Sequence, residues 1–152
     1  YWPGRLPEWT YENINRRCFV EELLTDEHGR LPNDYRFYTF KGDTKVIGVD
    51  SYDEFGNKSV KHFFPDWRPI NAKLKAGRKW LIESEKLPDQ PNNLDLMLEL
   101  SSKLGSEFDW IRVDLYTMNN KVFFGELTNF PTAGQGKYSP NFLDEYLGKF
   151  FK

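Results

Sequence analysis

Cysteine is nearly absent from the 152-residue chain, since Cys18 is the only one. A single cysteine excludes an intramolecular disulfide framework and a thiolate zinc site, and it favours a reducing, cytoplasmic location. No apolar run approaches the roughly 20 residues that span a bilayer, so we expect no membrane span. A basic excess is also missing, because 21 Lys and Arg stand against 23 Asp and Glu. That balance argues against a nucleic-acid partner, whose usual surface is strongly basic.

Aromatic residues, in contrast, are abundant: thirteen Phe, eight Tyr and five Trp make up 17% of the chain. This content argues against disorder, although the mean hydropathy is -0.70. A length of 152 residues suits one domain with a core of its own. The chain begins at Tyr1 rather than at a methionine, and we expect it to be a fragment of a longer protein.

Strand patterns dominate the first 65 residues of the chain. Short apolar or alternating runs predict strands over 18–24, 34–40, 44–50 and 59–64. Residues 65–91 are interrupted by prolines and are expected to be irregular, with a short helix near 78–85.

Two helices are predicted in the second half of the chain. The first begins at Asn92 or Asn93, either of which can cap it, and stops at Gly105. The second begins with Ser139 as its cap and Pro140 in its first turn. Their apolar stripes are Leu94, Met97, Leu98 and Leu104, and Leu143, Tyr146, Leu147 and Phe150. Hairpin-connected strands with such helices predict an α+β fold, an antiparallel sheet covered on one face by helices.

Residues 111–128 predict a β-hairpin that carries charges inside its strands. Arg112 and Asp114 lie on the first strand and Glu126 lies on the second. Because side chains alternate between the two faces of a strand, Arg112 and Asp114 share a face, opposite the apolar side chains between them.

The connection between the two strands decides which face Glu126 occupies. A two-residue turn over 119–120 pairs Asp114 with the residue before Glu126 and puts Glu126 on the wrong face. A three-residue loop over 118–120 pairs Arg112 with Glu126 and gathers the apolar residues on the other face. We therefore predict the three-residue loop.

The charged face of this hairpin has two interpretations. Asp114 and Glu126, with the oxygens of Thr128 or Asn129 nearby, suit Mg²⁺, and Arg112 supplies positive charge for phosphoryl oxygens. Alternatively, Arg112 and Glu126 form a solvated ion pair that contributes little to stability. The spacing alone leaves both interpretations open.

A family resemblance bears on that choice. The last part of the chain, IRVDLY…KVFFGELTNFPTAGQGKYSP, resembles the last core segment of ATP-grasp ligases, in which an R-x-D strand precedes a strand ending in E-x-N. Further segments resemble the TupA-like ATP-grasp family, named for teichuronopeptide biosynthesis. They include EWTYENINRRCFVEELL, LPNDYRFYTFKGDTKVIGVD, FFPDW and LDEYLGKFF, in the expected order over nearly the whole chain.

The resemblance implies roles for the hairpin residues. Asp114 and Glu126 match the magnesium ligands that bridge the metal to the ATP phosphates. Arg112 matches the catalytic residue that stabilises the acyl phosphate and the tetrahedral intermediate. The usual asparagine ligand falls at Thr128, with Asn129 one residue later, and both remain candidates.

The resemblance also implies an ATP site upstream of the hairpin. Asp34 lies where a carboxylate often binds ribose, and Arg36 lies where the family usually has a lysine that contacts phosphate or substrate. The residues that match the adenine-binding hinge are Glu21, Glu22, Leu23 and Leu24.

The implied activity is that of an ATP- and Mg²⁺-dependent carboxylate–amine ligase in cell-surface polysaccharide or teichuronopeptide-type biosynthesis. The carboxylate is expected to belong to an amino acid or a uronic acid. The alternatives are a glycosyltransferase of polysaccharide biosynthesis and a non-catalytic binding module.

One family feature has no counterpart in this sequence. The glycine-rich loop and lysine that cover the triphosphate precede the hinge in the family, but only twenty residues precede Glu21. We therefore interpret residues 1–152 as a single domain, the C-terminal subdomain of an ATP-grasp fold without its N-terminal part. On this interpretation the chain alone binds ATP weakly and does not turn over.

Overall fold

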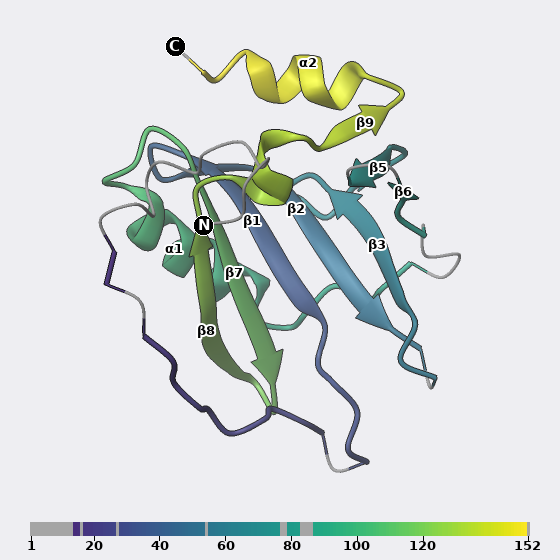
Figure 1. Ribbon diagram of the computed structural model, residues 1–152, viewed down its shortest axis with the longest axis vertical. Helices are drawn as coiled ribbons and strands as arrows, with labels where there is room; N and C mark the ends of the chain where they lie inside the picture. Colours follow the sequence, from purple (N-terminus) through teal and green to yellow (C-terminus); the bar gives the residue numbers. More distant parts are fainter. Residues whose placement is uncertain are drawn as a thin grey trace.

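The centre of the protein is an antiparallel six-stranded sheet with the strand order β4-β3-β2-β1-β7-β8 (Figure 1). The computed structural model describes residues 14–15, 17–26, 28–53, 55–76, 79–82 and 87–151. The strands are β1 (Asp34–Phe40), β2 (Asp43–Tyr52), β3 (Lys58–Phe63), β4 (Pro69–Ile70), β7 (Ile111–Met118) and β8 (Lys121–Thr128). Strand β1 thus pairs with β7 of the predicted hairpin β7–β8, which brings the first and last thirds of the sequence together.

Helix α1 (Leu94–Gly105) covers one face of the sheet, behind it in Figure 1. Its Leu94 and Met97 are buried against β1, β2 and β7, in a core that includes Phe37, Ile47 and Val113. The predicted stripe is wrong in one position, because Leu104 is partly exposed and Ser101 is buried instead. Ser101 is tolerated there because its hydroxyl hydrogen-bonds to Thr44 on β2, 3.0 Å away.

Helix α2 (Phe142–Gly148) lies at one end of the opposite face, together with a small sheet of order β6-β5-β9 (Figure 1). The small sheet consists of β5 (Lys73–Ala76), β6 (Lys79–Trp80) and β9 (Lys137–Ser139), and the 3₁₀ helix η2 (Pro131–Gly134) precedes β9. Leu143 and Leu147 of α2 pack in a second core with Tyr38 and Val46. The α+β class is confirmed, while the two helices belong to different faces.

Three local predictions are wrong. Residues 18–24 form no strand but an extended, largely exposed segment. The helix expected near 78–85 is absent from its described part, where β6 occurs, and residues 83–86 lie outside the described ones. The N-cap position of α2 is Asn141, without a side-chain capping hydrogen bond, whereas Ser139 belongs to β9 and pairs with Lys73. Neither α1 nor α2, the α-helices of the described residues, is long and apolar enough to cross a bilayer.

Candidate functional site

A two-residue turn connects β7 to β8, so the predicted three-residue loop is wrong. Met118 pairs with Lys121, and Asn119 and Asn120 between them have φ angles of 52° and 58°. Asparagine is among the residues that adopt this left-handed region most readily, and two such residues make the turn that suits the twist of a hairpin.

A β-bulge in β8 restores the charged face that the short turn would otherwise disrupt. Leu115 pairs with Phe124 and Asp114 pairs with Glu126, so Gly125 is an extra residue in β8. The bulge returns Glu126 to the face of Asp114. The predicted common face is therefore correct, but Arg112 lies opposite Thr128 rather than opposite Glu126.

Arg112 is the centre of the polar contacts on this hairpin. Its Nε and Nη2 donate to the two oxygens of Asp114, at 2.7 and 2.5 Å. Nη2 also donates to Oε1 of Glu126 at 2.8 Å and to Oγ1 of Thr128 at 3.0 Å. The Thr128 hydroxyl in turn donates to Glu126 at 2.8 Å. Arg112 and Asp114 are buried, whereas the Glu126 side chain is 63% exposed, so the cluster opens toward solvent at Glu126.

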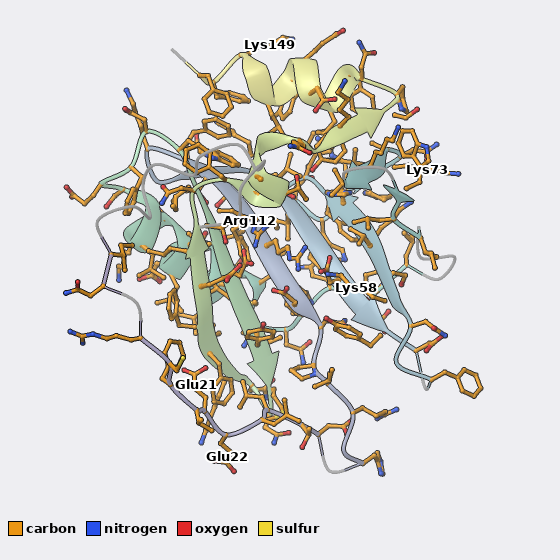
Figure 2. All side chains as sticks on the ribbon, viewed as in Figure 1. Glu21, Glu22, Lys58, Lys73, Arg112 and Lys149 are labelled. Atoms are coloured by element: carbon orange, nitrogen blue, oxygen red, sulfur yellow. The ribbon has the colours of Figure 1, made fainter. Side chains whose placement is uncertain are left out.

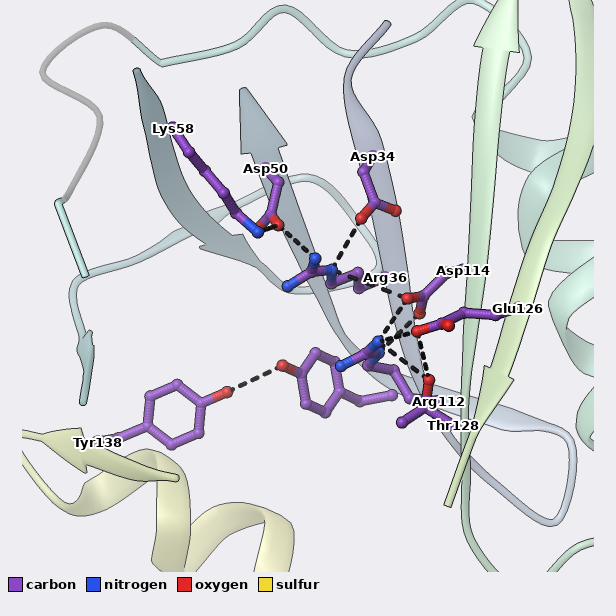
Figure 3. Close-up of polar contacts among 10 residues, drawn as sticks. Asp34, Arg36, Asp50, Lys58, Arg112, Asp114, Glu126, Thr128 and Tyr138 are labelled. Atoms are coloured by element: carbon purple, nitrogen blue, oxygen red, sulfur yellow. Dashed lines mark hydrogen bonds and ion pairs between the residues drawn. The ribbon is translucent and has the colours of Figure 1, made fainter. Parts of the chain in front are cut away.

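The network continues onto β1, the neighbouring strand (Figure 3). Arg36 pairs in register with Asp114, and its Nε is 3.8 Å from Oδ2 of that carboxylate. The same Nε donates to Asp34 at 3.0 Å, and Nη2 lies 2.5 Å from Oδ2 of Asp50 on β2. Lys58 on β3 also pairs with Asp50. A row of alternating charge thus crosses five adjacent strands, from β3 to β8.

Asp50 and Lys58 are members of this row that the sequence did not indicate. Asp50 resembles a turn residue in the sequence, but it lies within β2, is fully buried and contacts both Arg36 and Lys58. The available signal was its spacing: Asp50 lies opposite Asp34 when β1 and β2 are paired as a hairpin.

Burial sets the protonation behaviour of the row. Burial raises the pKa of Asp114 to about 6, against the opposing effect of Arg112. Burial also raises the pKa of Asp34. Burial opposes the charge of Arg36, but the carboxylates of Asp50, Asp34 and Asp114 outweigh it and raise the pKa of the guanidinium. The arginines therefore remain charged, while Asp114 titrates close to neutral pH.

The row borders a cavity of about 600 Å³ that also receives the extended N-terminal segment. Figure 2 shows Glu21 and Glu22 on this segment, beside the β7–β8 hairpin. The cavity is lined by predicted site residues from both regions, namely Glu21, Glu22, Leu23, Leu24, Asp34, Arg36, Asp114 and Glu126. Residues more than 90 positions apart in the sequence, such as Glu21 and Asp114, therefore meet in one space of ligand size.

The two candidates for a third metal ligand lie in different surroundings. The Thr128 hydroxyl contacts Glu126, beside the carboxylate pair. Asn129 lines a neighbouring cavity, and its backbone carbonyl accepts a hydrogen bond from Trp110 Nε1 at 3.0 Å. Among the described residues, no group of three His, Cys, Asp or Glu side chains is arranged to hold a metal ion. A metal here would rely on two carboxylates and on oxygens from elsewhere.

The arrangement is suited to binding an anionic ligand together with a cation, since paired carboxylates and fixed guanidinium groups lie in or beside one cavity. Searches of curated proteins and of solved structures found no significant match. A comparison with protein families, however, matches residues 6–152 to the family described as TupA-like ATPgrasp. The match covers essentially the whole chain, which therefore belongs to the TupA-like ATP-grasp family.

Proposed function

We propose that the protein is the C-terminal part of an ATP-dependent carboxylate–amine ligase. The cavity between residues 21–24 and the β7–β8 hairpin is its proposed Mg·ATP site. Membership of the ATP-grasp family supports a ligase of this general kind. The observation that carries the proposal is the cavity itself, in which Asp114 and Glu126 lie opposite each other, beside Arg36 and Asp34.

The donor set fits Mg²⁺. Its atoms are all oxygens, from Asp114, Glu126 and the Thr128 hydroxyl, and Mg²⁺ is commonly held by one or two carboxylates that share it with substrate phosphates and water. Asn129 remains the alternative third ligand. Bound there, the ion would draw negative charge from the phosphates. The same two carboxylates contact Arg112, so the guanidinium would hold them in place and limit the repulsion between them.

The proposed reaction has two steps. A carboxylate oxygen of the substrate attacks the γ-phosphorus of ATP, the bond to the ADP oxygen breaks, and an acyl phosphate and ADP result. An amine then attacks the acyl carbon, inorganic phosphate leaves with the C–O bonding pair, and the amine loses a proton to give the amide. Arg112 would stabilise the oxyanion that develops in the second step, because a fixed cation next to a forming negative charge lowers the barrier.

The biological setting comes from the resemblance. We propose an amino acid or a uronic acid as the carboxylate substrate, and cell-surface polysaccharide or teichuronopeptide-type biosynthesis as the pathway. The cytoplasmic location and the lack of turnover by the chain alone stay predictions.

Calorimetric titration with Mg·ATP and with Mg·UDP-glucose tests this function. We expect the chain alone to bind Mg·ATP weakly and Asp114→Asn to reduce that affinity at least tenfold further, since a proposed metal ligand is lost. Asp43→Asn is the matched control, because Asp43 is an exposed carboxylate at the start of β2 that pairs only locally, with Lys45. Preference for Mg·UDP-glucose would instead support a glycosyltransferase, and binding of neither nucleotide would support a non-catalytic module.

A further inference from the structure

A second cavity, of about 530 Å³, lies next to the proposed ATP site. It is formed between the charged face of the large sheet and the outer layer that contains η2, β9 and α2. The two cavities share Arg36, which lines both. A ligand in the second cavity would therefore lie beside a nucleotide in the first.

Three cations face this second cavity from the large sheet: Arg36, Lys58 and Arg112. Arg36 and Arg112 use Nε and Nη2 for their carboxylate partners. Figure 3 shows the third nitrogen of each guanidinium without a drawn contact, directed toward the side on which Tyr138 lies. Two fixed guanidinium groups with donors on the same side form a suitable receptor for one carboxylate.

Most of the rest of the cavity wall is apolar or aromatic. Trp110 and Tyr38 lie on the sheet side, while Phe130, Tyr138 and Phe151 lie on the outer side. Tyr138 is held in place, because its hydroxyl donates to Tyr38 Oη at 3.3 Å and lies 3.3 Å from Nε2 of His62. The outer layer also supplies Asp144, whose Oδ2 accepts the Tyr138 backbone N–H at 2.8 Å. Positive charge thus concentrates at the sheet side, and apolar side chains form most of the remainder, beside the polar Asn129, Thr132 and Asp144.

We propose that this second cavity binds the carboxylate substrate of the ligase and selects carboxylates that carry a ring-sized apolar body. The inference rests on the proposed function for its role, and on the cavity for its selectivity, which favours an amino acid with an apolar side chain over a uronic acid as the carboxylate substrate. The guanidinium groups recognise the carboxylate, and the aromatic walls recognise the body by burying its apolar surface. A short carboxylate such as propionate satisfies the first requirement and not the second.

The probes that separate these requirements are 3-phenylpropionate, propionate and the uncharged 3-phenylpropanol. Titrations followed by protein NMR are expected to show that 3-phenylpropionate binds at least tenfold more tightly than either of the others. Equal binding of propionate would overturn the role of the walls, and equal binding of 3-phenylpropanol would overturn the role of the arginines. Tighter binding of glucuronate than of 3-phenylpropionate would also overturn the proposal, since the walls would then recognise hydroxyl groups.

Filling the cavity tests its location. Gly148, the last residue of α2, lines the cavity, and a Cβ there would meet no atom within 4 Å. Gly148→Trp is expected to reduce the affinity for 3-phenylpropionate at least tenfold, because the indole would occupy the cavity. Lys149→Trp is the matched control, because the exposed Lys149 is adjacent in sequence, does not line the cavity and projects away from the sheet in Figure 2. Phe130→Ala is a second variant, which removes one aromatic side chain from the wall. It should reduce the affinity for 3-phenylpropionate but not the affinity for propionate.

Mg·ATP titration of the same samples separates the two possible failures. If Mg·ATP binds and 3-phenylpropionate does not, or if Gly148→Trp leaves 3-phenylpropionate unchanged, the second cavity is not the substrate site and this inference fails alone. If 3-phenylpropionate binds as expected but Mg·ATP does not, the cavity stands as a carboxylate site and the ligase function fails. Thermal unfolding of each variant verifies that it is folded.

Discussion

Asp114 lies directly opposite Glu126 across β7 and β8, although the turn that joins the strands has the wrong length for this pairing. The bulge at Gly125 makes up the difference. A Cβ on Gly125 would lie 2.8 Å from Cε2 of Tyr116 and 3.0 Å from the backbone oxygen of Asp114. Glycine therefore fits where the Tyr116 ring and the Asp114 backbone leave no room for a Cβ, and the separation of the two proposed metal ligands depends on it.

Gly125→Ala is expected both to destabilise the protein and to lower its affinity for Mg·ATP. Relieving contacts as short as 2.8 and 3.0 Å needs a shift of backbone or of the Tyr116 ring, which costs about 1–3 kcal/mol of unfolding free energy. The same shift moves Glu126 away from Asp114. Urea unfolding and Mg·ATP titration measure the two effects. Lys121→Ala, at an exposed position on the same strand, should change both by little, and an unchanged Mg·ATP affinity in Gly125→Ala would contradict the role of the bulge.

The two helices offer a matched test of glycine in different surroundings. Gly105 and Gly148 are the last residues of α1 and α2. A Cβ on Gly105 would lie 2.6 Å from Cγ2 of Thr39, whereas one on Gly148 meets nothing within 4 Å. Alanine is intrinsically preferred over glycine in a helix by about 1 kcal/mol. Gly148→Ala should therefore be neutral or stabilising, while Gly105→Ala should lose about 1–3 kcal/mol because α1 must move off the sheet.

Urea unfolding of these two variants measures the difference. Comparable effects would show that local helix preference, not contact with Thr39, decides the cost. The sequence predicted Gly105 as a stop signal. In the structure its importance comes from the close packing of α1 on β1, a tertiary contact that no local pattern reveals.

The β7–β8 hairpin illustrates which features of the site could be predicted from the sequence. Alternation along β7 was sufficient to predict that Arg112 and Asp114 share a face, because it follows from backbone geometry. The position of Glu126 required the register of a second strand, which a single inserted residue changes. In the structure Asn119 and Asn120 both adopt the left-handed conformation that the short turn requires, and the bulge reconciles that turn with a common charged face.

Local sequence patterns could not predict the outer residues of the site, for a different reason. Lys58 belongs to the row only because β3 pairs with β2, and Tyr138 faces the second cavity only because β9 pairs with β5. The pairing of β9 also overrides the capping preference that Ser139 shows in the sequence. The first pairing joins consecutive strands and the second joins strands far apart in the sequence, and in both cases the strand register, which local patterns do not specify, decides the position.

Asp50 offers a test of how much the row depends on a buried carboxylate. Asp50→Asn removes the charge between Arg36 and Lys58 while preserving the size of the side chain. Breaking a buried ion pair on one side leaves a charge poorly compensated, so we expect a loss of about 3 kcal/mol in unfolding free energy. Mg·ATP should also bind less tightly, because Arg36 loses one of the groups that orient it.

Asp43→Asn is the matched control, since Asp43 lies on the same strand but is 66% exposed. Surface ion pairs contribute little, and the change should stay within about 0.5 kcal/mol. Equal effects of the two substitutions on unfolding would refute a structural role for the buried row.

The raised pKa of Asp114 predicts opposite pH trends for stability and for metal binding. Burial raises this pKa from 3.8 to about 6, so the folded protein holds the proton more tightly than the unfolded chain. The resulting stabilisation is fully present below about pH 4 and is lost as the pH rises through 6, with a maximum of roughly 3 kcal/mol. The raised pKa of Asp34 acts in the same direction. A bound cation needs the ionised carboxylate, so Mg·ATP affinity should rise over the same interval.

Urea unfolding between pH 4.5 and 7.5, on the parent protein and on Asp114→Asn, isolates the effect of Asp114. Exposed carboxylates with lowered pKa values, such as Asp26 and Asp53, make stability rise with pH at the acid end, but both proteins share them. The difference between the two proteins should therefore shift in favour of Asp114→Asn as the pH increases. Parallel profiles would mean that Arg112 fully compensates the buried charge. In that case Asp114 would be ionised throughout the interval, and the rise in Mg·ATP affinity would disappear with the stability trend.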